Sequence, residues 1–569
     1  MSPEPAKLLT REDVARQEIG HTRISRALAL TLTGVFLATL VGVPLAQLVH
    51  DVAVHPAQGR EEGWPQAFDV FLAVPHAVDV ARDSPRGPLG RILDAGNAMA
   101  DELQLFQRTL KWQSVLNTAL VPYANTVLTE WLGAGGEEVY VGRSGWLFYK
   151  PDADHAAGPG FLDEGWLARR RRAGVQPDPR PAILDFGRQL RARGIALVVM
   201  PTPGKPTIQP EALSAAYGPA SQVGRVVQNP SFAAFKADLV REGVLVFDVS
   251  EALRQARLQT GQPQYLRTDT HWRPEAAERA ARLLGEFLDQ RVPLPPAVPV
   301  AYRSEPVEVT AHGDLAVMLR LAMDSPAFGA ESVTVHEVLM PDGAPWRASR
   351  AADVLVLGDS MSNIYSGEWM GWGDAAGMVE HLALAMRRPV DAILRNGAGA
   401  RATREILARE LARGRDRLAG KRVVVWQFAD RELSIGDWRL VDLHLGRPPA
   451  SGAFVPPQGT AVVVTGTVAA VSAVPRPGRT PYRNHIMAVH LTDVAVRKGG
   501  EVQDAFVYLW SMRDRVLTPA ASYRPGDEVT LRLLPWSDVA KLHGGINRSE
   551  LAGDELYLQE PCWGEPVNP

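Results

Sequence analysis

The longest apolar stretch of the chain lies near its N-terminus, where residues 27–50 contain no Asp, Glu, Lys or Arg. At a helical rise of about 1.5 Å per residue, this stretch is long enough to cross the roughly 30 Å hydrocarbon core of a bilayer. Arg23 and Arg26 precede it directly, and positive charge on that side predicts a cytoplasmic segment 1–26 with everything after residue 50 outside. The pattern therefore predicts a transmembrane signal anchor at residues 27–50.

Two other interpretations of this stretch stay open. A signal peptide cleaved after Ala46 needs a small residue three positions before the cut, and the chain has Pro44 there. A buried core helix would be equally apolar. No later segment is as long without a charge, so the rest of the chain is expected to be soluble.

Residues 51–136 are expected to be helical, with a break at the Pro- and Gly-containing residues 84–90. Beyond the break, roughly over residues 92–132, apolar positions such as Leu103, Phe106 and Leu110 recur at helical spacing. The favoured interpretation is a packing helix, or a stalk that holds the outer part of the chain away from the membrane.

From residue 181 the pattern changes to helices that alternate with short apolar strands. Before this point, an apolar run with a turn occupies residues 139–149, and the Gly-, Asp- and Arg-rich residues that follow, up to the 170s, are expected to form a loop. Helices are predicted at 182–193, 231–242, 274–290 and near 403–413, and strands at 195–200, 244–249, 353–357, 393–394 and 422–426.

Short, wholly apolar strands between helices indicate a parallel sheet covered on both faces. We assign this α/β domain to residues 137–445. Open sheets of this kind bind their ligands at the carboxyl ends of the strands, so that edge is where functional residues are expected.

After residue 445 the chain becomes β-like. A Pro- and Gly-rich linker at 446–459 leads to a small β domain at 460–569, with strands predicted at 461–474, 485–496, 505–512, 528–534 and 555–559. Five strands in this length suggest a small barrel or sandwich, with an OB-like barrel preferred. Trp510 and Trp536 could stack on sugars there, but buried core aromatics are the favoured interpretation.

Composition excludes several classes of protein. Of the 569 residues 46% are hydrophobic and 22% charged, which rules out a wholly disordered chain. The net charge is −3, so no basic excess points to a nucleic-acid partner. The single cysteine, Cys562, excludes an intrachain disulfide, a Cys-rich zinc site and a CxxC pair, and the histidines form no HExxH motif. No metal and no cofactor is expected.

Two segments carry candidate chemistry. Ser360 follows the predicted strand 353–357 through a Gly358–Asp359 turn, which would expose its hydroxyl at the ligand-binding edge near backbone N–H groups that can stabilise an oxyanion. A serine needs a base to become a nucleophile. In an extended stretch Asp269 and His271 project to the same side, so that Asp269 can hold one ring nitrogen while the other accepts the Ser360 proton. Pro274 is expected to close this strand and open a helix.

A family resemblance adds to this interpretation. The motifs at 141–149, 201–205, 269–272, 358–360 and 426–433 occur in the order found in the SGNH-hydrolase-like domain of the alginate O-acetyltransferase AlgJ/AlgX group, which the chain resembles over roughly residues 100–440. The resemblance implies an SGNH-like, flavodoxin-like parallel sheet with flanking helices. It also implies a periplasmic enzyme that moves acetyl groups on polysaccharide hydroxyls, with Asp269 and His271 as the Asp-x-His pair and Ser360 as the nucleophile.

The resemblance extends to further residues. Ordinary SGNH esterases carry the nucleophile first and the Asp–His pair last, and the reversed order here is shared with the AlgJ/AlgX group. Asn396 and Gly397 best match the oxyanion donors, and Arg395 and Tyr365 are candidates for contact with a uronate or acetyl group. Five other motif residues are expected to be structural or solvated: Trp146, Tyr149, Trp426 and Arg431 as structural residues, and Lys205 as a solvated lysine.

The predicted topology has a consequence for the acetyl donor. Acetyl-CoA is cytoplasmic, whereas Ser360 is predicted outside, and one span cannot conduct an acetyl group. A multi-span membrane-bound O-acyltransferase partner is therefore expected, as the resemblance also implies. The reaction predicted is ping-pong transfer through an acetyl-serine to a sugar hydroxyl of an exopolysaccharide.

Two alternatives have different consequences. A carbohydrate acetylesterase would use the same triad with water as acceptor, whereas a non-catalytic glycan-binding or scaffold subunit would leave Ser360 unreactive. The polysaccharide, the role of the β domain and the oligomeric state are not encoded in any motif that we recognise.

Overall fold

The computed structural model describes residues 25–54, 73–83, 87–218, 226–446, 453–475, 482–496, 501–551 and 559–567, together with the single residues 71, 477 and 480. The chain divides into two compact units, Met1–Leu120 and Val121–Pro569. Helix α5 (Val115–Leu132) crosses the boundary. Each unit is described by itself below.

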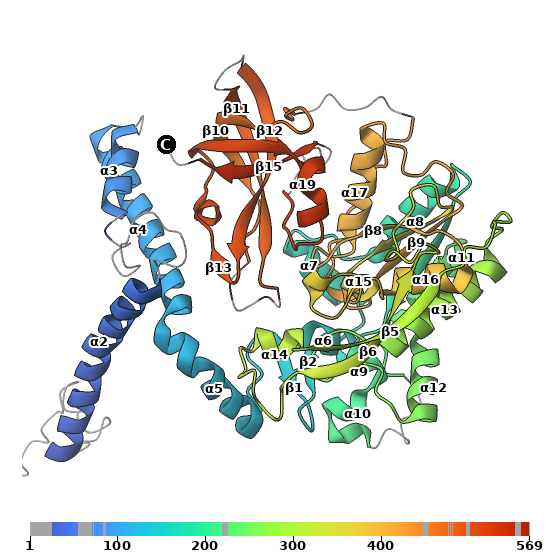
Figure 1. Ribbon diagram of the computed structural model, residues 1–569, viewed down its shortest axis with the longest axis horizontal. Coiled ribbons are helices and arrows are strands. Elements are labelled where there is room, and N and C mark those ends of the chain that lie inside the picture. Colours follow the sequence, from blue (N-terminus) through green and yellow to red (C-terminus); the bar gives the residue numbers. More distant parts are fainter. Residues whose placement is uncertain are drawn as a thin grey trace, which may run out of the picture. The chain divides into compact units, whose positions relative to one another are not determined.

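The first unit is helical (Figure 1). It contains α2 (Arg26–Val54), α3 (Ala73–Asp83), α4 (Pro88–Gln113) and the start of α5. Within the described residues, α2 alone is long and apolar enough to cross a membrane, over Arg26–His50, and its apolar window is not buried. The predicted apolar helix is thus present, and its exposure disfavours a buried core helix. The single amphipathic helix expected over 92–132 is instead two helices, which are interrupted at Ser114.

A five-stranded parallel sheet forms the centre of the second unit. Its strands run in the order β4-β3-β9-β7-β8, and every neighbouring pair is parallel. The strands are β3 (Ala196–Thr202), β4 (Leu245–Val246), β7 (Val354–Gly358), β8 (Asp391–Leu394) and β9 (Val423–Ala429). All five lie within or next to the predicted strands, because each is an apolar run too short for a helix.

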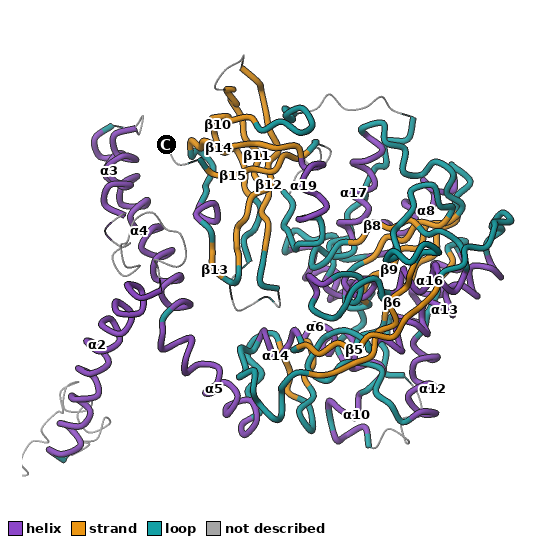
Figure 2. Tube along the Cα trace, viewed as in Figure 1, coloured by secondary structure: helices purple, strands orange, loops and turns teal. Residues whose placement is uncertain are grey.

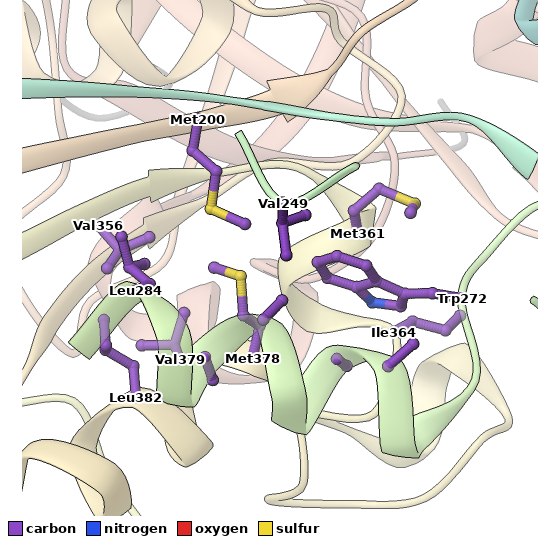
Figure 3. Close-up of a cluster of buried hydrophobic side chains, with 14 of the residues drawn as sticks. Met200, Val249, Trp272, Leu284, Val356, Met361, Ile364, Met378, Val379 and Leu382 are labelled. Carbon is purple, nitrogen blue, oxygen red and sulfur yellow. The ribbon is translucent and has the colours of Figure 1, made fainter. Parts of the chain in front are cut away.

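Side chains alternate between the two faces of this sheet, and each face is covered by helices. Val354, Val356 and Met200 pack on one face with α12 (Ser250–Thr260), α13 (Pro274–Arg291) and α16 (Met378–Met386). Figure 3 shows part of this cluster, with Met200 and Val356 facing Leu284, Met378 and Val379. The other face packs against α8 (Pro179–Arg191), α11 (Phe232–Arg241) and α17 (Arg401–Ala412). The doubly covered parallel sheet predicted from the sequence is confirmed.

The loop expected after residue 149 is one of the sequence expectations in this domain that are wrong. The segment expected to be a loop after residue 149 contains α6 (Lys150–Ala157) and α7 (Glu164–Arg172). Asp163 caps α7 by accepting a hydrogen bond from the Gly165 N–H, and the arginines of its last turn lie at the negative end of the helix dipole. These terminal signals stabilise a helix in a segment whose composition is typical of a loop.

Further elements lie outside the parallel sheet. They are the antiparallel strand pairs β1–β2 (Val139–Val141 and Leu147–Tyr149) and β5–β6 (Arg303–Ala311 and Glu331–Leu339), the short helices α9 (Lys205–Ile208), α10 (Pro210–Leu213), α14 (Asp314–Met318), α15 (Ser360–Asn363) and α18 (Glu432–Ile435), and the 3₁₀ turns η3 (Ala215–Tyr217) and η5 (Glu368–Met370). Figure 2 shows the β5–β6 ribbon as a pair of long strands separate from the parallel sheet.

The C-terminal part is a closed β-barrel. The strands β10 (Val462–Val471), β11 (His485–Val496), β12 (Glu501–Arg513), β15 (Pro561–Pro566) and β14 (Glu528–Pro535) pair in this order, and β14 pairs back to β10. Only β12 and β15 are parallel among these neighbours. The short β13 (Val516–Leu517) pairs antiparallel with the end of β12, and the described part of the domain also contains η6 (Pro519–Ser522) and α19 (Trp536–His543). The predicted small all-β domain is confirmed as a barrel.

The strand predicted at 555–559 lies mostly outside the described residues, and the described residues after it form β15 at Pro561–Pro566. Trp510 and Trp536 are partly buried and pack around Trp563, whose ring centroid lies 5.5 Å from that of Trp510 and 6.1 Å from that of Trp536. Both pack against this core cluster but neither is fully buried, so the buried core aromatics of the favoured interpretation are present only in part.

Candidate active site

Ser360 stands at the carboxyl end of the sheet, directly after β7. Gly358 ends the strand and Ser360 begins α15, so the serine lies at a sharp turn with its side chain partly exposed. The turn needs glycine at 358, because a Cβ atom there would lie 2.5 Å from Ser362 Oγ and 2.9 Å from Leu394 Cδ2. The close approach of these elements explains the Gly-Asp-Ser order at the end of the strand.

Asp359 fixes the conformation of this turn. Its Oδ1 accepts hydrogen bonds from the Met361 N–H (2.9 Å) and Gln427 Nε2 (2.9 Å), and its Oδ2 accepts from the Ala429 N–H (2.7 Å). Gln427 in turn accepts from the Asp359 N–H and from Ser362 Oγ. Asp359 therefore caps α15 and ties the turn after β7 to β9.

Asp269 and His271 are in direct contact. Their side chains meet at 2.7 Å between His271 Nδ1 and Asp269 Oδ1, and the same oxygen accepts the His271 N–H at 3.0 Å. The expected extended strand is wrong, since the segment is a tight loop closed by a bridge between Tyr265 and Trp272 and by the Leu266 N–H to His271 carbonyl bond. The pairing arises because Asp269 folds back on its own loop, as aspartate side chains often do in turns.

The second oxygen of Asp269 is held as firmly as the first. Asp269 Oδ2 accepts the Asp314 N–H at 2.8 Å and Trp372 Nε1 at 3.1 Å. Burial works against the charge on Asp269, but the nearby His271 ring and the backbone N–H groups of His271 and Asp314 outweigh it and lower the pKa of Asp269. A carboxylate that stays ionised because it accepts several hydrogen bonds can hold the Nδ1–H of a neighbouring histidine and leave Nε2 free to accept a proton.

A second carboxylate lies beside the histidine. Asp314, the first residue of α14, has its Oδ2 3.8 Å from His271 Nδ1, and its Oδ1 accepts the Thr270 N–H at 2.7 Å. Burial, together with repulsion from Asp269, raises the pKa of Asp314 to about 6. Burial disfavours the charged His271 ring, but the charges and hydrogen bond of Asp269 and the charge of Asp314 prevail and raise the pKa of His271.

Two charged side chains, the partly buried Glu331 and the buried Lys205, bind the backbone of the loop that carries Asp269 and His271. Glu331 accepts hydrogen bonds from the Arg267 N–H and from the N–H and Oγ1 of Thr268. Lys205 Nζ donates to the Leu147 carbonyl (2.6 Å) and to the Arg267 carbonyl (3.3 Å). Its ammonium is almost fully buried, and desolvation lowers the pKa of Lys205 to about 8 against the attraction of neighbouring carboxylates. The expectation that Lys205 is a solvated lysine is wrong.

Lys205 gives a testable effect on stability. Replacing it with methionine should lower the free energy of unfolding by roughly 2–3 kcal/mol, because two buried carbonyls lose their donor and the buried carboxylates lose a cation. Urea unfolding at pH 7 of this variant beside Lys236→Met, a half-exposed lysine paired with Asp248, provides the measurement. Equal midpoints for the two variants would contradict this account of Lys205.

The residues that follow Ser360 in the chain pack against Trp272, the residue after His271. Met361 and Ile364 pack with Trp272 in one cluster, as Figure 3 shows, and Tyr365 Oη donates to the Trp272 carbonyl at 2.6 Å. The segment that begins at Ser360 and the residue after His271 are thus in contact. Among the described residues no hydrogen bond joins Ser360 Oγ to His271. Such bonds often form only when substrate is bound.

The other predicted site residues lie at the same edge. Asn396 and Gly397 follow β8, and Gly397 adopts a positive φ of 65°. Asn396 Nδ2 lies 3.2 Å from Met370 Sδ, and its Oδ1 is buried with no hydrogen-bond partner among the described residues. Tyr365 is fully buried, and Arg395 donates to the Ile546 and Arg548 carbonyls, so both are committed to internal contacts.

Sequence reasoning missed Asp314, Trp372 and Glu331. Each reaches Asp269 or its loop from far along the chain and from no recognisable motif. Asp269, His271 and Asp314 place one ligand atom each within 4.8 Å of the others, which is close enough to hold a metal ion. Both Asp269 oxygens, however, already accept hydrogen bonds from N–H donors, an arrangement that suits an acid–base pair better than a metal centre.

Comparison with known proteins gives the family. The family model described as "SGNH hydrolase-like domain, acetyltransferase AlgX" matches residues 139–430, which is more than half of the chain. The chain belongs to this family. The matched residues of this AlgX-like domain include Asp269, His271 and Ser360, and they end before the barrel.

Individual relatives match smaller parts. A probable alginate O-acetylase AlgJ from Pseudomonas fluorescens is 31% identical over 189 residues, which are 33% of this chain and 42% of the relative. A second probable alginate O-acetylase AlgJ, from Pseudomonas aeruginosa, is 32% identical over 151 residues, which are 26% of this chain and 33% of that relative. The chain therefore matches less than half the length of these curated relatives.

Solved structures resemble the chain only distantly. The O-acetyltransferase domain of Pseudomonas putida AlgJ is 23% identical, with 52% of this chain and 92% of that chain covered and a TM-score of 0.38. Pseudomonas aeruginosa AlgX is 16% identical, with 70% of this chain and 90% of that chain covered and a TM-score of 0.37.

Proposed function

We propose that this chain is a polysaccharide O-acetyltransferase in which Ser360 is the nucleophile, His271 the base and Asp269 the residue that orients the base. One observation carries the proposal: the buried, fully hydrogen-bonded Asp269 carboxylate holds His271 Nδ1 at 2.7 Å, at the sheet edge where the β7 turn presents Ser360. This arrangement leaves Nε2 of His271 as the nitrogen available for proton transfer.

The proposed reaction has two halves. His271 takes the proton of Ser360 as Oγ attacks the acetyl carbonyl of the donor, and the tetrahedral intermediate collapses to acetyl-serine as the donor leaves with that proton. A sugar hydroxyl then gives its proton to His271 and attacks the acetyl-serine, and Ser360 recovers a proton from the histidine. The Asn396 side chain and the backbone N–H of Gly397 are proposed to stabilise the oxyanion in both halves.

The strand order supports an SGNH-type sheet of flavodoxin-like connectivity. If β7, β8, β9, β3 and β4 are numbered 1 to 5, the order of the strands across the sheet, read from β8 to β4, is 2-1-3-4-5. In this numbering Ser360 follows the first strand and Asp269–His271 follows the last. We propose that the chain is a circularly permuted version of that order, which explains why the Asp–His pair precedes the serine in the sequence.

The barrel is proposed to be of the OB type. Without the short β13, the barrel strands pair in the order β10, β11, β12, β15, β14, which is first, second, third, fifth and fourth in the sequence. The third and the fifth strand, β12 and β15, are the parallel pair. The proposed organisation is residues 1–26 in the cytoplasm, a transmembrane anchor at 27–50, helices over 51–136, the SGNH-like domain at 137–445, a linker at 446–459 and the barrel at 460–569.

The partners follow from this placement. An α2 anchor in the inner membrane would leave the catalytic domain in the periplasm. The acetyl group would then come from a multi-span membrane-bound O-acyltransferase, and the acceptor would be an exopolysaccharide, for which the relatives named alginate O-acetylase offer a precedent.

The pH dependence of the reaction tests the role of Asp314. His271 must be neutral to accept a proton, and its raised pKa places the acid limb of the rate profile above the usual histidine value of 6.5. The Asp314→Asn variant keeps the N–H donor to Asp269 but removes one negative charge, so the limb should move to lower pH, by roughly 0.5 to 1 unit. The measurement is kcat/KM for a chromogenic acetate ester against pH, with Asp342→Asn, an exposed aspartate, as the control. A limb that stays in place would show that Asp314 does not act on the histidine.

Acetyl transfer itself is the decisive test of the function. The full chain is incubated with a chromogenic acetate ester and an oligosaccharide acceptor, and the acetylated sugar is quantified beside free acetate. A transferase makes acetylated sugar in an amount that rises with acceptor concentration. Release of acetate alone would make the chain an esterase, and no turnover together with no labelling of Ser360 by a fluorophosphonate would make it a non-catalytic subunit.

A further inference from the structure

Helix α5 has a broad apolar face that is exposed. Leu120, Val127 and Trp131 lie on one side of the helix, because residues three, four and seven positions apart share a helical face. Their side chains are 58%, 50% and 78% exposed, and the exposed Tyr123 and Leu128 flank them. These five residues are called the α5 face below. Single exposed apolar residues are common, but a contiguous patch marks a surface that contacts lipid or another protein.

The opposite side of α5 is the polar one, and it binds the SGNH-like domain. Asn125 Nδ2 donates to the carbonyl of Leu319, which directly follows α14, at 2.8 Å (Figure 1). The Ala322 N–H donates to Thr126 Oγ1 at 2.8 Å, and Thr129, about one turn further on, is buried. A surface helix normally turns its apolar side to the core and its polar side to water. Helix α5 has the reverse arrangement, so its own domain does not use the apolar face.

The start of α5 is joined to the apolar helix α2. Within the first unit, the Val115 N–H donates to Gln47 Oε1 at 2.9 Å. Gln47 is buried and lies near the C-terminal end of the candidate span Arg26–His50. In the proposed topology this end of the span lies at the outer surface of the membrane. Helix α5 therefore begins at the boundary between lipid and water.

The composition of the α5 face suits this boundary. Tyr123 and Trp131 each combine an apolar ring with one polar group, and such side chains are favoured at the depth of the lipid headgroups. The 18 residues of α5 include one charged side chain, Glu130, so little charge would lose its water when the helix contacts lipid. The position of the helix start and the nature of the face thus favour lipid over a soluble protein partner.

We infer that the α5 face lies in the lipid surface of the membrane that α2 crosses, so that α5 is an interfacial helix. The inference rests on the placement of α2 in the proposed function. It keeps the SGNH-like domain at the membrane surface, where the acetyl donor of the proposed reaction arrives, instead of holding the domain away from the membrane as a stalk would.

The test places a fluorescent label on the α5 face of the full chain. The Val127→Cys variant is labelled with a nitrobenzoxadiazole dye, and the unchanged chain, whose single Cys562 is buried, gives the background. The labelled chain is reconstituted into vesicles of equal parts phosphatidylethanolamine and phosphatidylglycerol, with and without a lipid that carries a nitroxide close to its headgroup. A nitroxide quenches the dye at short range, so quenching reports contact between the label and lipid.

The matched control is Val240→Cys, because Val240 is a valine of α11 that is 56% exposed. The nitroxide lipid is expected to quench the label at position 127 about threefold more than the label at position 240. Leu132→Asp, which adds a charge next to the α5 face, should lower the quenching at position 127. Leu542→Asp should not, although Leu542 on α19 is as exposed as Leu132, at 76% against 75%.

Equal quenching at positions 127 and 240 would overturn the inference, as would a chain that does not bind the vesicles. A label at 127 that is shielded from iodide in water but is not quenched by the nitroxide lipid would assign the face to a protein partner or a second copy, and the inference would fail. The measurement needs no acetyl chemistry. If lipid quenches the label but the chain transfers no acetyl group, the lipid contact stands and the proposed function fails.

Discussion

Replacing Ser360 with alanine is expected to lower the hydrolysis of a chromogenic acetate ester about 10⁴-fold or more, to the level of a bound but unactivated ester. In the proposed mechanism the Ser360 hydroxyl is the group that becomes acetylated, whereas the other serine of this turn, Ser362, is buried and donates its hydroxyl to Gln427. Loss of a nucleophile in a serine–histidine site removes nearly all of the acceleration that the site provides. The substitution should leave the fold intact, since Asp359 and Ser362, not Ser360, make the hydrogen bonds that hold the turn.

The control for this variant is Ser304→Ala, an exposed serine of the β5 strand, which should retain the wild-type rate. Thermal unfolding of both variants shows whether a loss comes from chemistry or from folding. Turnover by the Ser360→Ala variant at more than a hundredth of the wild-type rate would exclude Ser360 as the nucleophile.

The Asp269→Asn variant is expected to lose about 10³- to 10⁴-fold in kcat with little change in KM. An amide can still fill the space, but its NH₂ group would face Nδ1 and favour the tautomer whose Nε2 carries a proton, so that His271 cannot accept one from the serine. The surrounding donors, the Asp314 N–H and Trp372 Nε1, are placed for a carboxylate and keep it ionised.

Steady-state kinetics on the same ester, beside the exposed control Asp324→Asn, provide the measurement. A rise in KM with kcat unchanged would mean that Asp269 serves substrate binding instead of orienting the base.

The central sheet was predictable because each of its strands is a short run in which most residues are apolar. The two faces could be assigned only with the structure, where alternate side chains of β3, β7 and β9 enter different clusters. Helix α7 was not predicted, because four consecutive arginines are typical of a solvated loop, although the capping residue Asp163 was visible in the sequence. The length of β12 is set by its pairing with β11, and the position of β15 by its pairing with β14. The order of hydrophobic and polar residues within each strand does not predict these long-range pairings.

The candidate site was predictable to the extent that it is local. Asp269 and His271 are two residues apart, and their pairing is set within one loop, even though that loop is not the extended strand that was expected. Asp314 and Trp372 lie 45 and 103 residues from Asp269 in the sequence, and only the fold brings them to its carboxylate. Lys205 was misjudged for the same reason, since the carbonyls of Leu147 and Arg267 that bind it come from distant segments.

The direct test of the account is to trap the acetyl group on the enzyme. The full chain is mixed with an acetate ester without acceptor, quenched rapidly in acid and digested, and the peptide that carries Ser360 is examined by mass spectrometry. The account predicts one acetyl group on Ser360, its absence in the Ser360→Ala and Asp269→Asn variants, and its rapid discharge when an oligosaccharide is added. An ester that turns over while Ser360 stays unmodified, or an acetyl group found on a different residue, would contradict it.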